Sequence, residues 1–314
     1  MSLPKIYVIT GGTGAQGGAT VQALLKTSFS QPIIIRVLVR DPTSSAAKAV
    51  VSRSSQLTRV EVVKGDLNDI DSLKSALAGA TGVFSVQAAG PEEEIQGSNL
   101  VKAAKECGVR VFVHTSVSMT GKHESFPRWN ADWSYAWYWL SKHAVEEAVR
   151  NAHFDSFTIL RPALMMDNFK KPHCDLVFPQ YAERGVILTI GGLSTTTIQL
   201  IAAEDVGKFA AAAFADPVKF NRLEIELAAE WLTFLQIAQQ INSVTGKNVR
   251  SEVVAQGDAL SAGIHPQLIE GGVWWNEVGY SAADVDIAKS YGIPLISFID
   301  WVQMHKNEII SSLP

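Results

Sequence analysis

The stretch Trp129–Glu147, WNADWSYAWYWLSKHAVEE, contains a tyrosine and a lysine with the spacing of an acid/base pair. Tyr138 and Lys142 are four residues apart, so in a helix their side chains share one face. A lysine charge lowers the pKa of a neighbouring phenol, which then exchanges a proton with a substrate carbonyl during hydride transfer. Ser116 and Ser118 end a strand-like run 22 and 20 residues upstream of Tyr138. The alternative for Tyr138 is packing at the rim of a cleft with its hydroxyl in water.

A glycine-rich turn, GGTGAQG at residues 11–17, follows the first strand-like run and opens a helical pattern. It fits both GxxGxxG and GxGxxG. Glycines permit the tight turn and the close approach of a pyrophosphate, and the amino end of the helix offers free N–H groups and its positive dipole. We therefore predict a dinucleotide-binding turn. Its expected cofactor contacts are Gly11, Thr13, Gly14, Ala15, Gln16 and Gly17.

The end of the second strand-like run indicates which dinucleotide is bound. Arg40 follows Ile33–Val39 directly. An acid at this place binds the ribose hydroxyls of NAD, whereas an arginine suits the 2′-phosphate of NADP. Asp41 comes one position later, before Pro42, where aspartate is also common for turn formation. We favour NADP(H); the alternative is that Arg40 is a solvated charge at a strand end.

Two further strand ends carry expected cofactor contacts. In GDLND, Asp66 is placed to accept the adenine amino group beside Leu67, and either Asn68 or Asp69 is expected to cap the next helix. After the fourth strand, the QAAGP stretch begins with Gln87 and Ala88, whose neighbours are small enough for a cofactor to pass. The same residues would also suit an ordinary loop. Ligands of open α/β sheets bind outside the carboxyl ends of the strands, which is why these positions matter.

The elements that position these residues alternate through the first half of the chain. Continuous apolar runs such as IYVIT and VFVHT suit a parallel sheet that is buried on both faces. Six strands alternating with helices predict an α/β fold, a Rossmann-type doubly wound parallel sheet. The strands are expected at Lys5–Thr10, Ile33–Val39, Arg59–Lys64, Gly82–Val86, Arg110–Thr115 and Ser156–Leu160. The helices are expected at Ala15–Lys26, Ser44–Arg53, Ile70–Leu77, Glu93–Cys107 and Asp132–Asn151.

Beyond residue 162 the pattern becomes richer in loops. We expect an NADP-binding Rossmann domain over 1–162 and a smaller C-terminal α/β part over 163–314 that binds substrate and is interwoven with the first. Strands are expected at Thr197–Leu200, Glu224–Leu227 and Val249–Val254, and helices at Ala203–Phe214, Thr233–Thr245, Ala282–Tyr291 and Ser297–Ser311. Trp129, Trp133 and Trp137 recur every four residues, which predicts one helical stripe. Gly271-Gly272, before the pair Trp274-Trp275, is a candidate hinge.

Composition narrows the class of protein. The 314 residues are 47% hydrophobic and 18% charged, with a formal net charge of −4, so neither a nucleic-acid surface nor an anionic membrane surface is expected. The two cysteines, Cys107 and Cys174, are far apart, and the histidines show no metal spacing, so no metal site is expected. His114, inside an apolar run, is expected to be a hydrogen-bonded core residue. No signal-peptide pattern or apolar membrane span is visible, and we expect a cytoplasmic protein.

The glycine turn, Arg40, GDLND, the strand FVHTSVS and the later LRPALMMDNF together resemble the NmrA-like family, an atypical branch of the short-chain dehydrogenase/reductase superfamily. The resemblance covers nearly the whole chain and implies NADP(H) at these motifs. It also implies that Lys142 holds the nicotinamide ribose, and that Leu164, Met165, Met166 and Asp167 lie where the family passes its backbone under the nicotinamide. Sensor-type members usually keep the lysine and lack the tyrosine, so Tyr138 departs from them toward the catalytic pattern.

The expected function is an NADP(H)-dependent oxidoreductase that reduces a carbonyl or conjugated double bond of an apolar small molecule. Tyr138 would supply the proton, Lys142 would orient the ribose, and Ser116 would steady the oxygen. Two alternatives stay open. One is a non-catalytic NADP(H)-binding redox sensor that acts through a protein partner, and the other is an NADP-binding lyase, dehydratase or epimerase. A homodimer or a regulatory partner is compatible with the aromatic stretch around Tyr138.

Overall fold

The computed structural model describes residues 3–52, 58–192 and 195–314. The chain forms two compact units, and each draws on several segments. The first comprises Met1–Thr120, Trp137–Arg161 and Ala203–Ile225, and the second comprises Gly121–Ala136, Pro162–Ala202 and Glu226–Pro314. The chain therefore crosses between the units at residues 121, 137, 162, 203 and 226.

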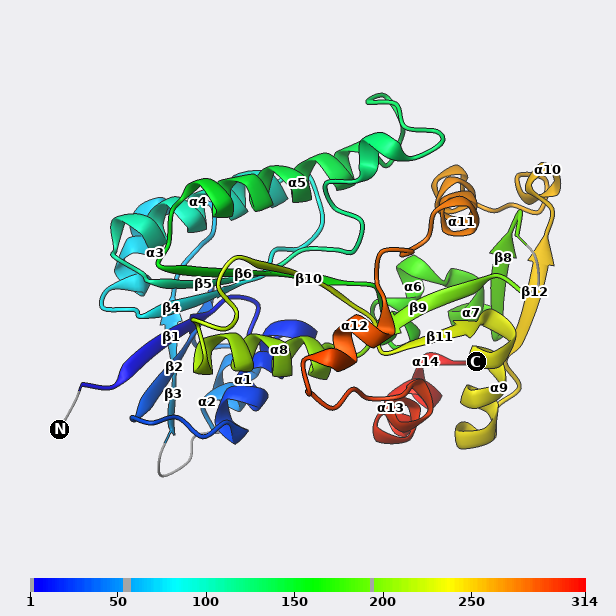
Figure 1. Cartoon of the computed structure of the whole chain (residues 1–314). Coiled ribbons are helices and arrows are strands. Elements are labelled where there is room, and N and C mark those ends of the chain that lie inside the picture. Colours follow the sequence, from blue (N-terminus) through cyan, green and yellow to red (C-terminus); the bar gives the residue numbers. More distant parts are fainter. Residues whose placement is uncertain (1–2, 53–57, 193–194) are drawn as a thin grey trace. The chain divides into compact units, whose positions relative to one another are not determined.

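A seven-stranded sheet forms the centre of the first unit (Figure 1). Its strand order is β10-β6-β5-β4-β1-β2-β3, and β1 to β6 pair in parallel with their neighbours. The strands are β1 (Lys5–Ile9), β2 (Ile33–Val39), β3 (Thr58–Lys64), β4 (Gly82–Ser85), β5 (Val111–Thr115), β6 (Ser156–Pro162) and β10 (Leu223–Leu227). Strand order reverses between β1 and β4, the place where doubly wound sheets bind ligands. The predicted Rossmann-type fold is confirmed.

Helices cover both faces of this sheet. They are α1 (Ala15–Lys26), α2 (Ser45–Val51), α3 (Ile70–Leu77), α4 (Glu93–Glu106), α5 (Ala136–Asn151) and α8 (Ala203–Ala215). Helices α3, α4 and α5 lie over one face, and α1 packs against α8 on the other (Figure 1). The contact between α1 and α8 is so close that a Cβ on Gly207 would lie 2.5 Å from the carbonyl carbon of Ala19.

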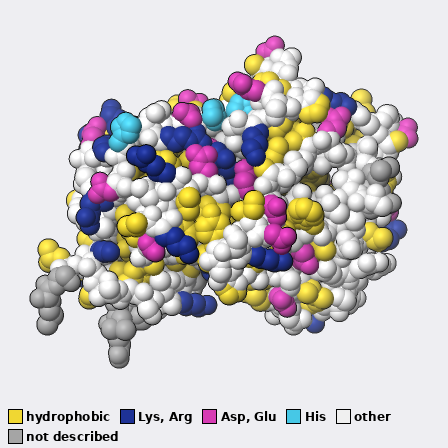
Figure 2. Space-filling view, in the orientation of Figure 1, with side chains coloured by type: hydrophobic (Ala, Val, Ile, Leu, Met, Phe, Trp, Pro, Cys, Tyr) yellow, Lys and Arg dark blue, Asp and Glu magenta, His cyan; other side chains and the backbone are white. Residues whose placement is uncertain are grey.

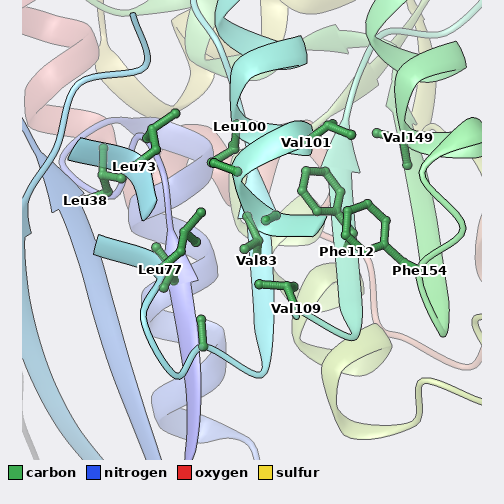
Figure 3. Packing of buried hydrophobic residues seen from close by; sticks show 14 of the residues in the cluster. Leu38, Leu73, Leu77, Val83, Leu100, Val101, Val109, Phe112, Val149 and Phe154 are labelled. Carbon is green, nitrogen blue, oxygen red and sulfur yellow. The ribbon is translucent and has the colours of Figure 1, made fainter. Parts of the chain in front are cut away.

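The apolar core under α3, α4 and α5 fixes the sheet relative to these helices (Figure 3). Leu77 of α3, Leu100 of α4 and Val149 of α5 are fully buried in it. From the sheet side, the ring of Phe112 stacks on that of Phe154 with centroids 4.7 Å apart. Close packing of this kind keeps the strands rigid, so the loops at their carboxyl ends start from fixed positions.

In the second unit, the described residues form two small sheets. One has the order β11-β9-β7 and the other pairs β12 with β8. The strands are β7 (Leu164–Met165), β8 (Val186–Ile190), β9 (Thr197–Ile201), β11 (Glu230–Thr233) and β12 (Arg250–Val254). The α-helices are α6 (Cys174–Val177), α7 (Pro179–Arg184), α9 (Phe234–Thr245), α10 (Gln256–Ala259), α11 (Pro266–Glu277), α12 (Val285–Ser290), α13 (Phe298–Met304) and α14 (Lys306–Ser312). Two 3₁₀ turns cover His123–Ser125 and Met166–Phe169.

The predicted helical stripe of tryptophans is wrong. The helix expected from Asp132 begins only at Ala136, so Trp129 and Trp133 precede it and form no helical stripe with Trp137. The cause is local: Asn130 Oδ1 accepts a hydrogen bond from the Asp132 N–H, and this Asx turn competes with the helix.

The predicted hinge at Gly271-Gly272 instead lies inside α11. A Cβ on Gly272 would lie 2.8 Å from the Cβ of Ile190, so this glycine serves close packing against β8. The helix expected over Ser297–Ser311 is broken at His305 into α13 and α14. The predicted end of another helix at Arg53 falls outside the described residues, and α2 ends at Val51.

No helix in the described ranges is long and apolar enough to cross a membrane. The face drawn in Figure 2 carries acidic and basic side chains interspersed with hydrophobic ones, as a mixed surface does. This distribution agrees with the small net charge of −4.

Candidate functional site

The glycine turn between β1 and α1 has the geometry of a phosphate cradle. Gly11 adopts φ +58°, and a Cβ there would lie 2.6 Å from Val86 Cγ1. A Cβ on Gly17 would lie 2.3 Å from the carbonyl oxygen of Gly11, so any larger residue would force the turn open. Gly14 is the N-cap of α1, and no side chain from the described residues caps this end of the helix. Thr13 and Gly14 are exposed, so the amino end of α1 is open to an anion.

A hydrogen bond connects this turn to the end of β5. Thr115 Oγ1 donates to Gln16 Oε1 at 2.7 Å. The next residue, Ser116, is buried; its N–H donates to the Leu160 carbonyl at 2.8 Å, and its Oγ lies 3.2 Å from Thr120 Oγ1. Ala15 and Gln16 in the first turn of α1 are therefore held next to the strand that carries the predicted catalytic serine.

The predicted adenosine contacts lie at the ends of β2 and β3. Arg40 is exposed and forms no ion pair with another described residue. Asp41 Oδ1 accepts from the Thr43 N–H at 2.8 Å and from Thr43 Oγ1 at 2.6 Å, and these hydrogen bonds hold the pKa of the Asp41 carboxyl below its usual value. The Asp41 carboxylate therefore stabilises the turn in which it lies. Along the next strand end, Asp66 is half-buried and accepts from the Asn68 N–H at 2.9 Å.

The carbonyl oxygen of Leu67, beside Asp66, accepts a hydrogen bond from Asn99 Nδ2 at 3.0 Å, which ties this loop to α4. Asp69 is the N-cap of α3 and accepts from the N–H groups of Asp71 and Ser72. The expectation that one of Asn68 and Asp69 caps the helix is confirmed, with Asp69 in that role.

A row of buried polar groups runs from the end of β4 to β5. Gln87 Nε2 donates to Ser85 Oγ at 3.0 Å, and Ser85 Oγ lies 3.2 Å from His114 Nδ1. Gln87 Oε1 is buried without a hydrogen-bond partner among the described residues, while Ala88 is exposed. Burial lowers the pKa of His114 to about 4; the nearby Glu146 carboxylate opposes this change and the Lys142 ammonium adds to it. His114 is a hydrogen-bonded core residue, as predicted.

Tyr138 and Lys142 lie on one face of α5, as their spacing predicts. Lys142 Nζ is 4.8 Å from the centroid of the Tyr138 ring, and Tyr138 is half-buried. Lys142 itself is buried, and its Nζ donates to Glu93 Oε1 at 2.6 Å. Glu93 Oε2 accepts a longer hydrogen bond from Ser141 Oγ at 3.2 Å.

Sequence reasoning missed the role of Glu93, because the run Glu92-Glu93-Glu94 indicates an acidic first turn of α4 and nothing more. Glu93 is the buried member of this run, and it is 49 residues from Lys142 in sequence. Only the packing of α4 against α5 shows that its carboxylate compensates the lysine charge.

A second ion cluster anchors the carboxyl half of α5. Glu146 is fully buried and accepts two hydrogen bonds from the Arg161 guanidinium, at 2.9 and 2.6 Å. Arg150 joins Glu146 to Glu224 with bonds of 2.7 and 2.6 Å. Bidentate arginine pairs are geometrically restrictive, so this cluster holds α5, and with it Tyr138 and Lys142, on the sheet.

The remaining predicted cofactor contacts, Leu164 to Asp167, lie in the second unit. Leu164 and Met165 form β7, which pairs in parallel with Leu200 and Ile201 of β9. Met166 and Asp167 are buried, and Asp167 is paired with Lys170 at 3.2 Å. Their expected contact with a cofactor stays a prediction. No group of three potential metal ligands occurs among the described residues.

The chain is a member of the NmrA-like family, whose model matches residues 4–304. Among curated proteins, it is 26% identical over 282 residues to the NmrA-like family domain-containing oxidoreductase hkm9 of Aspergillus hancockii, covering 84% of this chain and 79% of that protein. Among solved structures, the triphenylmethane reductase of Citrobacter sp., complexed with NADP(H), superposes with a TM-score of 0.70 at 23% identity, covering 96% of this chain and 99% of that one.

The negative transcriptional regulator NmrA, in complex with NAD, superposes with a TM-score of 0.73 at 18% identity, covering 100% and 99% of the two chains. At these identities the two structures confirm the fold. One of these proteins is a reductase and the other is a regulator, so the fold is compatible with either function.

Proposed function

We propose that this protein is an NADP(H)-dependent oxidoreductase that reduces a carbonyl or a conjugated double bond of an apolar small molecule. The observation that carries the proposal is the open amino end of α1 behind the Gly11–Gly17 turn, at the point where the strand order reverses. A Cβ at Gly11 or Gly17 would fill this turn, so its shape fits a group that approaches the backbone closely. The curated relative described above is named an oxidoreductase, which agrees with this class.

The strand ends favour NADP(H) over NAD(H). Arg40 is exposed, and an arginine side chain suits a 2′-phosphate. Asp41, the one acid that could bind ribose hydroxyls there, already accepts two hydrogen bonds from Thr43. Gln87 Oε1, buried and without a described partner, is an acceptor that a ligand donor would satisfy.

The proposed chemistry uses the face of α5 that carries Tyr138 and Lys142. A bound nicotinamide would supply the hydride. Tyr138 would donate its phenolic proton to the substrate oxygen that gains electrons, and the Lys142 ammonium, 4.8 Å from the ring centroid, would stabilise the phenolate left behind. Glu93 holds Lys142 in place, and a bound ribose would have to share the ammonium with this carboxylate. Ser116, fixed at the end of β5, is the proposed second donor to the substrate oxygen.

The cofactor assignment is tested by binding titrations with NADPH and NADH. Arg40→Ala removes a charge-assisted contact to phosphate, so NADPH affinity should fall about tenfold while NADH affinity stays unchanged. Arg184→Ala, which removes another exposed arginine, on α7, is the matched control. If Arg40→Ala leaves the ratio of the two affinities unchanged, Arg40 does not bind the 2′-phosphate.

The catalytic assignment is tested by NADPH consumption against a panel of quinones and ketones. Tyr138→Phe should lower kcat by about 10²-fold or more, the usual contribution of a general acid, and leave NADPH affinity unchanged. Tyr291→Phe, at a half-buried tyrosine of the second unit, is the control. A substrate that is still reduced at the original rate by Tyr138→Phe would exclude this hydroxyl as the proton donor.

The second candidate is a non-catalytic NADP(H)-binding regulator. It is favoured by the Lys142–Glu93 ion pair, because a lysine whose charge is compensated at 2.6 Å has less influence on a tyrosine than a free one. A regulator would bind NADPH without consuming it in the presence of any member of the panel. A lyase, dehydratase or epimerase would convert substrate without net NADPH consumption.

A further inference from the structure

A cavity of about 150 Å³ lies within the second unit, between the segment that precedes α5 and helix α11. Three aromatic side chains line it: Phe126, Trp133 and Trp274. The rings of Phe126 and Trp274 meet at 61° with centroids 5.8 Å apart, and both residues are buried. A cavity of about this size holds a single small ring or an equally compact group.

Two carboxylates of α11, Glu270 and Glu277, line the same cavity, and their electrostatic surroundings differ. Glu277 Oε1 is paired with Arg128 Nη2 at 2.6 Å, so these two charges cancel. Glu270 Oε2 accepts a hydrogen bond from the neutral hydroxyl of Ser134, and no cation of the described residues pairs with it. The lining therefore keeps one uncompensated negative charge.

The negative charge of Glu270 acts in a half-buried environment. Tyr135, which packs against α11 at Gly271, has its pKa raised by burial and, second, by the Glu270 carboxylate. A carboxylate that is partly removed from water and lacks a cation is costly, and a cationic ligand would remove this cost. Aromatic faces attract the same ligands, because the ring quadrupole is negative over its face.

We propose that this cavity binds an organic cation with an alkylated ammonium group, with the methyl groups against Phe126, Trp133 and Trp274 and the charge facing Glu270. Aromatic side chains with a nearby carboxylate are the arrangement by which proteins recognise such groups. Arg128 and Glu277 complete the lining, and their opposite charges cancel. The site lies wholly in residues of the second unit, so it does not rest on the proposed cofactor or reaction.

The proposal is tested with two probes of the same shape that differ in charge, choline and 3,3-dimethylbutan-1-ol. Binding is followed by tryptophan fluorescence and by ligand-observed NMR, with the full chain and without nicotinamide cofactor. Choline should bind at least about tenfold more tightly than the neutral alcohol, which corresponds to about 1.4 kcal/mol. Equal affinity for the two probes, or saturable binding of neither, would overturn the proposal.

Three variants locate the site. Glu270→Gln keeps an oxygen for the Ser134 hydroxyl and removes the charge, so choline affinity should fall to that of the alcohol, which itself should not change. Glu183→Gln removes the same charge from an exposed position on α7 and should leave both affinities unchanged. Trp133→Leu should weaken choline several-fold more than the alcohol. If Glu270→Gln and Glu183→Gln act alike, choline binds elsewhere and the assignment is wrong.

Discussion

Replacement of Glu93 by glutamine is the most direct perturbation of the candidate active site. Glu93 and Lys142 are 5% and 9% exposed at their side chains, and their charged atoms are 2.6 Å apart. Glutamine retains one acceptor oxygen, for Lys142 Nζ, and its NH2 group can donate to the Ser141 hydroxyl, but the negative charge is removed. The change therefore leaves a buried ammonium without compensation while the shape of the side chain is almost unchanged.

The expected loss of stability follows from the burial of the Glu93–Lys142 ion pair. Removal of one partner from a buried ion pair costs about 3 kcal/mol when a hydrogen bond is retained, the lower end of the usual range. For a chain of 314 residues, this corresponds to a fall in Tm of roughly 5 °C. NADPH carries several negative charges, so it should bind more tightly to Glu93→Gln than to the unmodified protein. We expect NADPH to restore most of the lost stability.

The assay is thermal unfolding of four proteins with and without saturating NADPH: the unmodified chain, Glu93→Gln, Lys142→Met and the double variant. The double variant should be more stable than Glu93→Gln alone, because no uncompensated charge remains, and the coupling free energy should be about 2 kcal/mol or more. Glu94→Gln removes the same charge from the exposed neighbour and serves as the control. Additive effects of Glu93→Gln and Lys142→Met, or equal effects of Glu93→Gln and Glu94→Gln, would refute the reasoning.

Two further predictions concern the turn and the buried histidine. Gly17→Ala places a Cβ 2.3 Å from the Gly11 carbonyl oxygen, so the turn must open; NADPH binding in a titration should fall more than tenfold, whereas Gly257→Ala, which meets no atom within 4 Å, should have no effect on binding. His114 has a folded pKa of about 4 against 6.5 when unfolded, so the unfolded chain binds the extra proton between these values. This difference in pKa lowers the free energy of unfolding by roughly 3 kcal/mol as the pH falls from 6.5 toward 4, and it has no such effect above pH 6.5. Urea unfolding at pH 4.5 and 7.5 should therefore show a larger difference for the unmodified protein than for His114→Gln, and equal differences would contradict this account.

The sequence by itself determined the elements whose signals are local. The alternation of β-branched runs with helical patterns placed the six parallel strands within two residues of their observed ends. The Gly11–Gly17 turn and the Tyr138–Lys142 spacing were equally readable, because a turn and one helix face depend on neighbouring residues. Local reasoning failed at Trp129 and Trp133, where periodicity predicted a helix and the Asx turn at Asn130 prevented it.

Only the tertiary structure decided which charges meet. The Glu93–Lys142 pair joins residues 49 positions apart, and the Ser134–Glu270 hydrogen bond joins residues 136 positions apart. Nothing in the spacing of such residues along the chain distinguishes them from solvated polar groups, since each contact arises from the packing of segments that are far apart in sequence. A buried glutamate therefore has a different role from an exposed one. A charge in the low-dielectric interior requires a partner, and a charge at the surface does not.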